Sequence, residues 1–400
     1  MADNNENKVL NVPHLRFPEF SGEWETKSIN DLADVIGGGT PDTTVKSYWD
    51  GGIQWFTPSE IGKNKFVDAS LRTITEDGLN NSSAKLLPPN TILLSSRATI
   101  GECSLSLREC ATNQGFQSLV SKKCNVDFLY YLIQTKKKDL IRKSCGSTFL
   151  EISANEVRKI QVSVPSDVEQ QKIAGLLSLI DKRIATQNKI IEDLKKLKSA
   201  IVDMLLCNQN SEMLKLGDIG YFVRGLTYAN EDVTENKAAT AVIRANNLNY
   251  GNHVDKGEVV YVSRTPATSQ ILRKGDIVIC MANGSSALVG KNSYYPFNDG
   301  QSTVGAFCGI YRTSHPLAKW LMQSQRYKRL VYQSLQGGNG AIANLNGDDI
   351  LNMSFPVMEK EKSKSIIFIL EAIEKSLAVN KDLQRSYSTQ KSHLLKQMFI

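Results

Sequence analysis

The sequence predicts an α+β protein in which two pseudo-symmetric mixed α/β globular domains are joined by two long helices that form an antiparallel coiled coil. Residues 173–205 place apolar side chains at alternating spacings of four and three, and residues 366–398 do the same 193 positions later. The segments in front of these helices have similar lengths and similar turn residues, although the rest of their sequences differs. A duplicated chain has a natural pseudo-two-fold axis, which suits a target that also comes in two halves.

The repeat sets the expected domain boundaries. We expect an N-terminal tail (1–21), a first globular domain (22–165), a first long helix (166–211), a second globular domain (212–357) and a second long helix (358–400). The openings of the two domains align at an offset of 187, which pairs Asp31 with Asp218, Gly38 with Gly225, and Thr40 with Thr227.

Within each copy the expected elements follow one order. An apolar strand is followed by a turn that leads into a second buried strand, then by a short helix, a glycine turn and a last strand that ends in proline. The ranges are 53–56 and 241–243 for the first strand, 86–94 and 271–279 for the turn with the second strand, 128–141 and 317–330 for the helix, 145–147 and 337–340 for the glycine turn, and 160–165 and 353–356 for the last strand. Gly37–Gly39 lacks the spacing of a dinucleotide site, so we expect a tight turn that allows close backbone approach.

The heptad positions of both helices form a largely apolar seam whose polar exceptions coincide. Gln187 matches Asn380, and Lys198 matches Lys391. Buried polar residues at shared positions fix register and partner choice. We expect the chain's own two helices to form the pair, with a homodimer through the same seam as the alternative. The alternative for the polar positions is that they lie on a solvent-facing edge of the seam. A helix over residues 168–206 would be about 58 Å long, enough to hold two units about one DNA turn (~34 Å) apart.

The bulk properties are those of an ordinary soluble protein. The chain has 400 residues, 41% of them hydrophobic and 22% charged, and no apolar run approaches the ~20 residues of a membrane span. Residues 1–8 are acidic and polar, unlike a signal peptide, so we expect a cytoplasmic protein without membrane contact. The net charge of +7 is a mild preference for polyanions, and the seven cysteines form no CxxC pair, which indicates reduced structural thiols.

Catalytic motifs are missing from the sequence. There is no P-loop, no Gly-x-Ser-x-Gly and no Asp/Asn-Pro-Pro-aromatic run of the kind with which amino-methyltransferases hold a base. Pro41-Asp42 followed by Glu60 and Lys63 is similar to a nuclease motif, but one residue too many separates the acid from the lysine. The sequence therefore predicts a binding protein and not an enzyme.

Polar and basic residues in the turns after the strands are the candidate contacts to double-stranded DNA. Arg reads guanine, Asn and Gln read adenine, Ser and Thr bond to either, and lysines suit phosphates. The candidates in the first domain are Lys63, Lys65, Lys85, Ser95, Ser96, Arg97, Thr99, Asn113, Gln114 and Gln117. Those in the second domain are Arg244, Asn246, Asn247, Asn249, Tyr250, Asn283, Ser285, Gln301 and Ser302. Ser95-Ser96-Arg97 aligns with the different sequence Met281-Ala282-Asn283, so the two half-sites are expected to differ.

An ordered set of motifs resembles one known family, the specificity subunits of type I restriction-modification systems. The chain carries the family's sequence features in order, over nearly its whole length. These are Leu15-Arg16-Phe17-Pro18-Glu19-Phe20, Glu23-Trp24-Glu25, Gly39-Thr40-Pro41, Gly146-Ser147-Thr148 with Ile152-Ser153, Val164-Pro165, and Glu169-Gln170-Gln171-Lys172-Ile173-Ala174 with Leu177 and Asp181. The second copy departs from the pattern, because Glu359–Lys362 stands where Glu-Gln-Gln is expected.

The resemblance implies more than the residues do. Each domain of such a subunit reads one half of a bipartite asymmetric DNA site, and its helices dock two modification subunits that bind S-adenosylmethionine and methylate adenine at N6. Two restriction subunits, which use ATP and Mg²⁺, can join. The chain itself would bind no cofactor and no metal. The residues implied in subunit docking are Glu169, Gln170, Lys172, Asp181 and Lys182.

Three alternatives come from other classes of protein. A stand-alone bipartite DNA-binding regulator would bind tightly without partners, and a coiled-coil scaffold would lack salt-dependent DNA affinity. A divergent nuclease would cut DNA with a divalent metal, although the sequence offers no carboxylate cluster to hold the ion.

Overall fold

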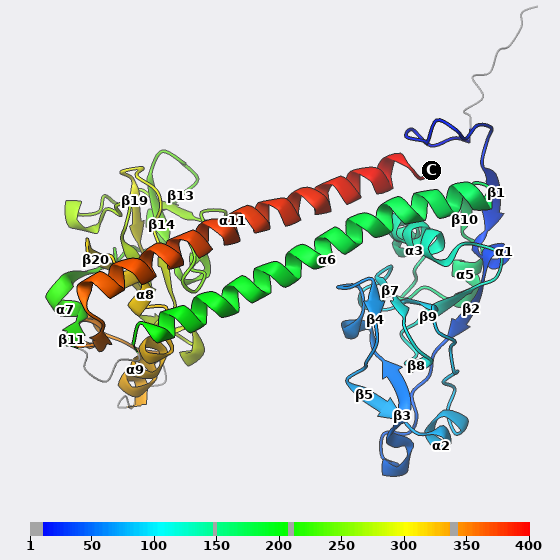
Figure 1. Cartoon of the computed structure of the whole chain (residues 1–400), viewed down its shortest axis with the longest axis horizontal. Helices are drawn as coiled ribbons and strands as arrows, with labels where there is room; N and C mark the ends of the chain where they lie inside the picture. Colours follow the sequence, from blue (N-terminus) through cyan, green and yellow to red (C-terminus); the bar gives the residue numbers. More distant parts are fainter. Residues whose placement is uncertain (1–10, 147–149, 207–211, 337–342) are drawn as a thin grey trace, which may run out of the picture. The chain divides into compact units, whose positions relative to one another are not determined.

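The chain folds as two compact units. The computed structural model describes residues 11–146, 150–206, 212–336 and 343–400 (Figure 1). Unit 1 comprises residues 1–188 and 382–400, and unit 2 comprises residues 189–381. Each unit therefore contains one globular part together with a stretch of each long helix. Among the described residues, no helix is long and apolar enough to cross a membrane.

The two long helices confirm the periodicity prediction. Helix α6 spans Asp167–Met204 and α11 spans Lys360–Gln397; both have 38 residues, and their first residues are 193 positions apart. All twenty predicted seam positions are buried or half-buried. In unit 1, Lys391 of α11 pairs with Asp181 of α6 at 2.7 Å, whereas in unit 2 Lys198 of α6 pairs with Glu374 of α11 at 2.8 Å. The two pairs exchange roles between the helices, as an antiparallel pair made by the chain's own two copies requires.

The polar seam positions are held by networks within each unit. Glu374 accepts hydrogen bonds at 2.8 Å from both Lys198 and Lys319, and both lysines lie over the Trp320 ring. Burial opposes ionisation of Glu374, but the two ammonium groups outweigh it and hold the pKa of the carboxyl below its usual value. Burial of the Lys198 ammonium lowers its pKa. Glu374 stabilises the charged ammonium but offsets only part of this effect, and the nearby positive charge of Lys319 lowers the pKa further. These contacts explain how a lysine occupies the seam.

Unit 1 is built on a five-stranded sheet in the order β2–β9–β6–β7–β4 and a three-stranded sheet in the order β5–β3–β8, with the pair β1–β10 beside them. The strands are β1 (Glu25–Ser28), β2 (Ala33–Gly37), β3 (Trp49–Phe56), β4 (Phe66–Val67), β5 (Arg72–Ile74), β6 (Ile92–Leu94), β7 (Cys103–Ser106), β8 (Cys110–Thr112), β9 (Gln117–Ser121) and β10 (Gln161–Val164). The helices are α1 (Ile29–Leu32), α2 (Glu76–Asn80), α3 (Val126–Thr135), α4 (Lys137–Arg142) and α5 (Ala154–Arg158).

Unit 2 repeats this plan with a four-stranded sheet in the order β12–β20–β16–β18 and a second one in the order β13–β15–β14–β19. The strands are β11 (Glu212–Lys215), β12 (Gly220–Arg224), β13 (Val233–Thr234), β14 (Thr240–Ile243), β15 (Val260–Val262), β16 (Ile277–Cys280), β17 (Ala282–Asn283), β18 (Asn292–Tyr294), β19 (Ser302–Val304), β20 (Cys308–Thr313), β21 (Ala343–Asn344) and β22 (Ser354–Val357). The helices are α7 (Leu216–Ile219), α8 (Ala318–Leu321), α9 (Gln325–Gln336) and α10 (Gly347–Leu351).

Strand pairing confirms the internal repeat. In unit 1, β3 and β8 run parallel and Phe56 pairs with Thr112; in unit 2, β14 and β19 run parallel and Ile243 pairs with Val304. The predicted strands are present in both copies. Each short helix predicted over 128–141 and 317–330 is divided in two, as α3 with α4 and α8 with α9, because the chain turns between them. The predicted glycine turn at 337–340 lies outside the described residues.

The sequence features at residues 15–20 and 169–172, both used for the family resemblance, contact each other in unit 1. Arg16 donates two hydrogen bonds to Glu169, at 2.7 and 2.8 Å, and Lys172 pairs with Glu19. Trp24 packs edge-to-face against Phe399, which follows α11. Residues 16–24 therefore contact both the beginning of α6 and the residues that follow α11.

Candidate nucleic-acid interface

In unit 1, three loops meet at the ends of neighbouring strands. They are residues 57–60 after β3, residues 95–101 after β6 and residues 113–116 between β8 and β9. Asn113 N donates to Phe56 O at 3.1 Å, and Ser96 N donates to Gly115 O at 2.8 Å. We call these segments the unit 1 loops; backbone hydrogen bonds fix their relative positions.

The equivalent segments meet in unit 2. These unit 2 loops are residues 244–247 after β14, residues 281–285 after β16 and residues 305–307 between β19 and β20. Met281 N donates to Phe307 O at 2.8 Å, as Ser96 N does to Gly115 O. The two sets of loops are therefore built on the same backbone plan.

In each unit, a glycine allows a neighbouring backbone segment to pack closely against one of these loops. A Cβ on Gly38 would overlap the carbonyl oxygens of Thr112 and Asn113, and a Cβ on Gly225 would overlap the carbonyl oxygen of Gly305. Only glycine leaves room for the backbones to come this close. The predicted close backbone approach is confirmed at Gly38, and its repeat partner behaves alike. The predicted tight turn is not found, because residues 38–42 form no turn.

The unit 2 loops surround a cavity of about 590 Å³. Three of the predicted DNA-contact residues line it: Arg244, Asn246 and Asn283. Sequence reasoning missed Tyr228 and Phe307, which line the same cavity. The remaining lining residues are Asn230, Ala245, Ala282, Gly284, Gly305, Ala306 and Cys308.

In unit 1, a cavity of about 920 Å³ is bordered by only one of the three loops, residues 95–101, together with α4 and residues 150–151. Arg97 and Thr99 line it, together with Lys137 of α4 and the exposed Leu150. The guanidinium of Arg97 pairs with Glu151 at 2.8 Å, with both side chains more than a third exposed, so water and salt weaken this pair. Gln114 is exposed, and its side-chain oxygen accepts a hydrogen bond from the hydroxyl of Thr40, which lies in the loop after β2.

Strand pairing corrects the predicted alignment of the two loops by one residue. Ser95 pairs with Phe116 in unit 1, and Cys280 pairs with Cys308 in unit 2. Arg97 therefore corresponds to Ala282 and not to Asn283. The arginines of the two sites come from different loops, Arg97 from the loop after β6 and Arg244 from the loop after β14.

Four predicted base contacts have structural positions instead. Ser95 and Ser96 are fully buried, and the Ser95 hydroxyl donates to Arg97 O at 2.7 Å. Ser302 is fully buried and bonds to Asp299. Asn247 is 2% exposed: it accepts from Arg244 N and donates to two carbonyls in the next loop. Their side chains are not available to DNA, and the prediction is corrected for these four residues.

Asn247 has the same structural role as its counterpart in the other copy of the repeat. In unit 1 the equivalent residue is Glu60, which accepts from Thr57 N at 2.8 Å and from Leu71 N at 2.6 Å. Both side chains cap a single 3₁₀ turn after the parallel strand and tie it to the following loop. An amide suited to adenine is used here to hold the backbone.

Lys65 is also a structural residue, and its predicted phosphate contact is corrected. Its ammonium lies 2.7 Å from Asp127 and donates to Ser178 Oγ at 2.7 Å and Tyr131 Oη at 3.1 Å. Its side chain is 9% exposed. Tyr131 donates in turn to Asp181 at 2.6 Å, so Lys65 belongs to the network that links β4, α3 and α6.

The other predicted contacts occupy several places. Lys63 and Lys85 are exposed near the unit 1 loops, since Lys63 follows residues 57–60 and the segment after Lys85 pairs with β8. Asn113 and Gln117 are half-buried at the two ends of the β8–β9 connection. Ser285 is exposed beside Asn283, to which its amide donates at 3.0 Å.

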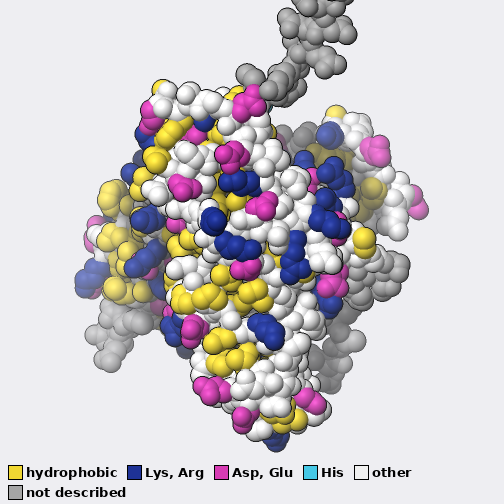
Figure 2. Space-filling model, turned by 90° about the vertical axis from the view of Figure 1, so that its right-hand side faces the viewer, with side chains coloured by type: hydrophobic (Ala, Val, Ile, Leu, Met, Phe, Trp, Pro, Cys, Tyr) yellow, Lys and Arg dark blue, Asp and Glu magenta, His cyan; other side chains and the backbone are white. Residues whose placement is uncertain are grey.

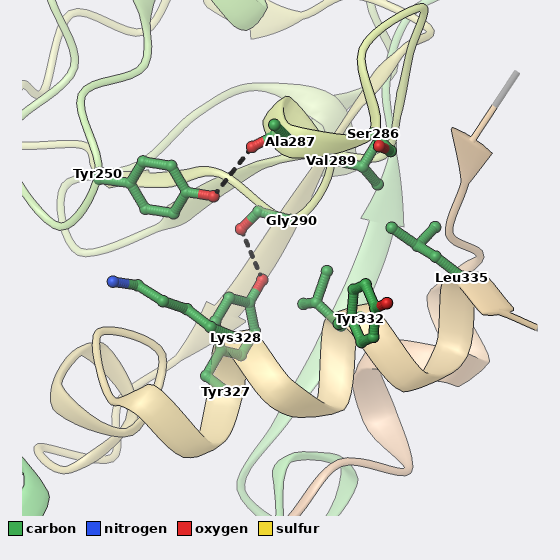
Figure 3. A pocket seen from close by; sticks show the side chains of 10 residues that line it. Tyr250, Ser286, Ala287, Val289, Gly290, Tyr327, Lys328, Tyr332 and Leu335 are labelled. Carbon is green, nitrogen blue, oxygen red and sulfur yellow. Dashed lines mark hydrogen bonds between the residues drawn. The ribbon is translucent and has the colours of Figure 1, made fainter.

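Three residues of unit 2 lie away from its loop cluster. Tyr250 lines a separate groove of about 500 Å³ against α9, where its hydroxyl donates to Ala287 O at 3.4 Å (Figure 3). The backbone N–H of Asn249 donates to Ser293 Oγ at 2.6 Å. Gln301 precedes β19, whereas the loop at Gly305 follows it. The structure therefore does not bring these three side chains together with Arg244 and Asn246.

The predicted docking set divides into internal and surface residues. Glu169 and Gln170 are buried, and Gln170 accepts from Asn125 N at 3.0 Å and donates to Pro165 O at 3.0 Å. Asp181 bonds to Tyr131 and Lys391. Their prediction as docking contacts is corrected, because these side chains already hold unit 1 together. Lys172 is half exposed and Lys182 is exposed, so both stay candidates.

Charge and metal chemistry complete the description. On the face drawn in Figure 2, lysine and arginine side chains stand among acidic and apolar ones. Within the described ranges, no group of three or more His, Cys, Asp or Glu side chains is arranged to hold a metal ion. The six described cysteines are free thiols.

Comparison with known proteins finds similarity to one family over part of the chain. The model of the type I restriction modification DNA specificity domain matches residues 21–196. The chain is 39% identical over 180 residues to the type I restriction enzyme MjaIX specificity subunit of Methanocaldococcus jannaschii, which covers 44% of this chain and 42% of that protein. It is 30% identical over 190 residues to the EcoR124I/EcoR124II specificity subunit of Escherichia coli, covering 46% of each. The matched part spans less than half the length of these relatives.

The fold extends the likeness over the whole chain. The structure of the type I restriction-modification system S subunit from M. genitalium aligns with a TM-score of 0.59 at 16% identity, covering 97% of this chain and 99% of that one. A structure described under complex assembly and conformational transition of the type I R-M system aligns with a TM-score of 0.56 at 13% identity, covering 96% and 99%. At such identities the likeness is one of fold.

Proposed function

We propose that this chain is a specificity subunit of a type I restriction-modification system, the non-catalytic subunit that reads a bipartite asymmetric DNA site. The observation that carries the proposal is the duplicated loop cluster. In each unit, the loops that follow the parallel strand pair have the same backbone arrangement. The two sets of loops differ in the side chains that they present. Equivalent scaffolds with different side chains are suited to two unlike half-sites.

The side chains near the loops support a division of roles. In unit 1, Arg97 and Gln114 would contact base edges, and Lys63 and Lys85 would contact phosphates. In unit 2, Arg244, Asn246 and Asn283 line one cavity, where the guanidinium suits guanine and the amides suit adenine. Because the loops differ in content, each half-site would have its own sequence.

The partners follow from the family. The relatives are named as subunits of restriction enzymes, and we propose that this chain likewise assembles with two modification subunits that use S-adenosylmethionine to methylate adenine at N6. Two restriction subunits, with ATP and Mg²⁺, would join optionally. The proposed docking surface includes the exposed Lys172 and Lys182 of α6, and the chain itself would need no cofactor.

Single-molecule sequencing for N6-methyladenine tests the proposal. Cells that carry this chain with its modification subunit are compared with cells from which this chain alone is deleted. We expect a two-part methylated motif that disappears with the deletion and returns when the chain is restored. Identical methylation in both strains, with the modification subunit present and folded, would contradict the proposal and favour a stand-alone regulator or a scaffold.

A further inference from the structure

The loop between β19 and β20 presents a large apolar side chain at the rim of the unit 2 cavity. Phe307 is 69% exposed, whereas the next residue, Cys308, is buried. The equivalent position in unit 1 is Gly115, because Ser96 N donates to Gly115 O as Met281 N donates to Phe307 O. Unit 1 therefore has no side chain at this point, and the aromatic ring distinguishes the two units.

The backbone that carries this ring is held on two sides. Cys308 N donates to Gly305 O at 2.8 Å and closes the turn, and Phe307 O accepts from Met281 N at 2.8 Å and Ala282 N at 3.2 Å. Gly225 packs directly behind the turn, where a Cβ would overlap Gly305 O. The ring is thus presented by a rigid turn, and covering it with a ligand would gain apolar burial at little cost in backbone ordering.

Polar side chains that suit base edges surround the ring. Arg244, Asn246 and Asn283 line the same cavity. The Asn283 side chain accepts from Ser285 N at 3.0 Å through its oxygen, so the side chain is held in the cavity wall. The one apolar group on a base edge in the major groove is the C5 methyl of thymine, for which phenylalanine is a suitable contact.

We propose that Phe307 is a specificity-determining residue that contacts the thymine C5 methyl group in the half-site read by unit 2. The inference rests on the proposed function and names a base that the duplicated polar residues alone do not. Contact through the major groove is favoured over insertion between base pairs, because the ring stands beside side chains that bond to base edges. Burial of one methyl group corresponds to about a fourfold change in affinity.

The experiment uses the complex of the full chain with its modification subunits and duplexes that carry its methylated motif. Each thymine of the second half-site is replaced singly by uracil, which removes only the methyl group. With the unaltered chain, we expect about a fourfold loss of affinity at one thymine. With Phe307→Ala, thymine and uracil at that position should bind equally, while the first half-site is read as before. Tyr332→Ala, which removes an aromatic ring of similar exposure (65%) on α9, is the matched control and should keep the discrimination.

Several results would overturn the inference. A second half-site without thymine would exclude it, as would a Phe307→Ala complex that discriminates thymine from uracil as well as the unaltered one. Uniformly weaker binding by Phe307→Ala, with the discrimination kept, would place the ring against the DNA backbone or a partner subunit. Failure of the proposed function is recognised separately, because the unaltered complex would then select no duplex at all.

Discussion

Removing Glu374 should destabilise unit 2 much more than removing a neighbouring carboxylate of the same helix. Glu374 lies 2.8 Å from the ammonium groups of both Lys198 and Lys319, and the three side chains are between 13 and 27% exposed. Breaking a fully buried pair costs about 3–5 kcal/mol and an exposed pair 0–1 kcal/mol. For this half-buried triad we expect Glu374→Ala to lower the free energy of unfolding by about 2–3 kcal/mol.

Two further variants make that prediction specific. Glu371→Ala removes an exposed carboxylate one turn earlier in α11 and should change stability by no more than about 0.5 kcal/mol. Replacing the triad together, as Lys198→Met, Lys319→Met and Glu374→Leu, removes both the charges and their desolvation, so this variant should be close to the unaltered chain or more stable.

Urea unfolding followed by circular dichroism measures these differences. Because two units need not unfold in one transition, hydrogen exchange of the amides in α11 should be measured alongside. The reasoning would be refuted if Glu374→Ala cost no more than Glu371→Ala, or if the triple variant were as unstable as Glu374→Ala.

Other predictions concern the loops and the charged networks. Gly225→Ala should abolish reading of the unit 2 half-site, because its Cβ would overlap Gly305 O, whereas Gly52→Ala in β3, which has open space, should leave the methylated motif unchanged. Burial opposes ionisation of Asp299, but hydrogen bonds from Lys256, Ser302 and Tyr295 outweigh it and lower its pKa to about 2, from an ordinary value of 3.8. Its contribution to stability is therefore present above about pH 4 and lost as the pH falls towards 2, so the unfolding free energies of the unaltered chain and Asp299→Asn should converge over that range. Lys65→Met should destabilise unit 1 in thermal unfolding, whereas Lys63→Met, at an exposed site, should have no measurable effect.

The repeat and the seam could be predicted because their information is local or periodic. Helical spacing identified both long helices, and the coincidence of Lys198 with Lys391 identified the polar seam positions. Their acidic partners could not be assigned beforehand, because Asp181 and Glu374 lie beside the seam and are recognised only when two helices face each other at one register. The second strands predicted within 86–94 and 271–279 were equally clear, since short apolar runs that follow a turn carry their own signal.

The site was less predictable because exposure depends on strand pairing. Ser95 and Ser96 have the composition of a polar loop, yet pairing with residues 115–116 buries both. Residue type gave Asn247 a base-reading role, whereas its repeat partner Glu60 shows a capping role. Phe307 was overlooked because an isolated aromatic residue in the sequence does not distinguish a core position from an exposed turn.

The most direct test of the central claim is to determine the methylated DNA motif in cells that carry a single-residue variant of one unit or of the other. N6-methyladenine sequencing is done for cells that carry Arg97→Ala or Asn246→Ala in place of the unaltered chain. The account predicts that each variant relaxes or abolishes one half of the methylated motif, a different half for each, while the other half keeps its sequence. Variants that alter the same half, or an unaltered motif in both, would contradict the account of two units that read separate half-sites.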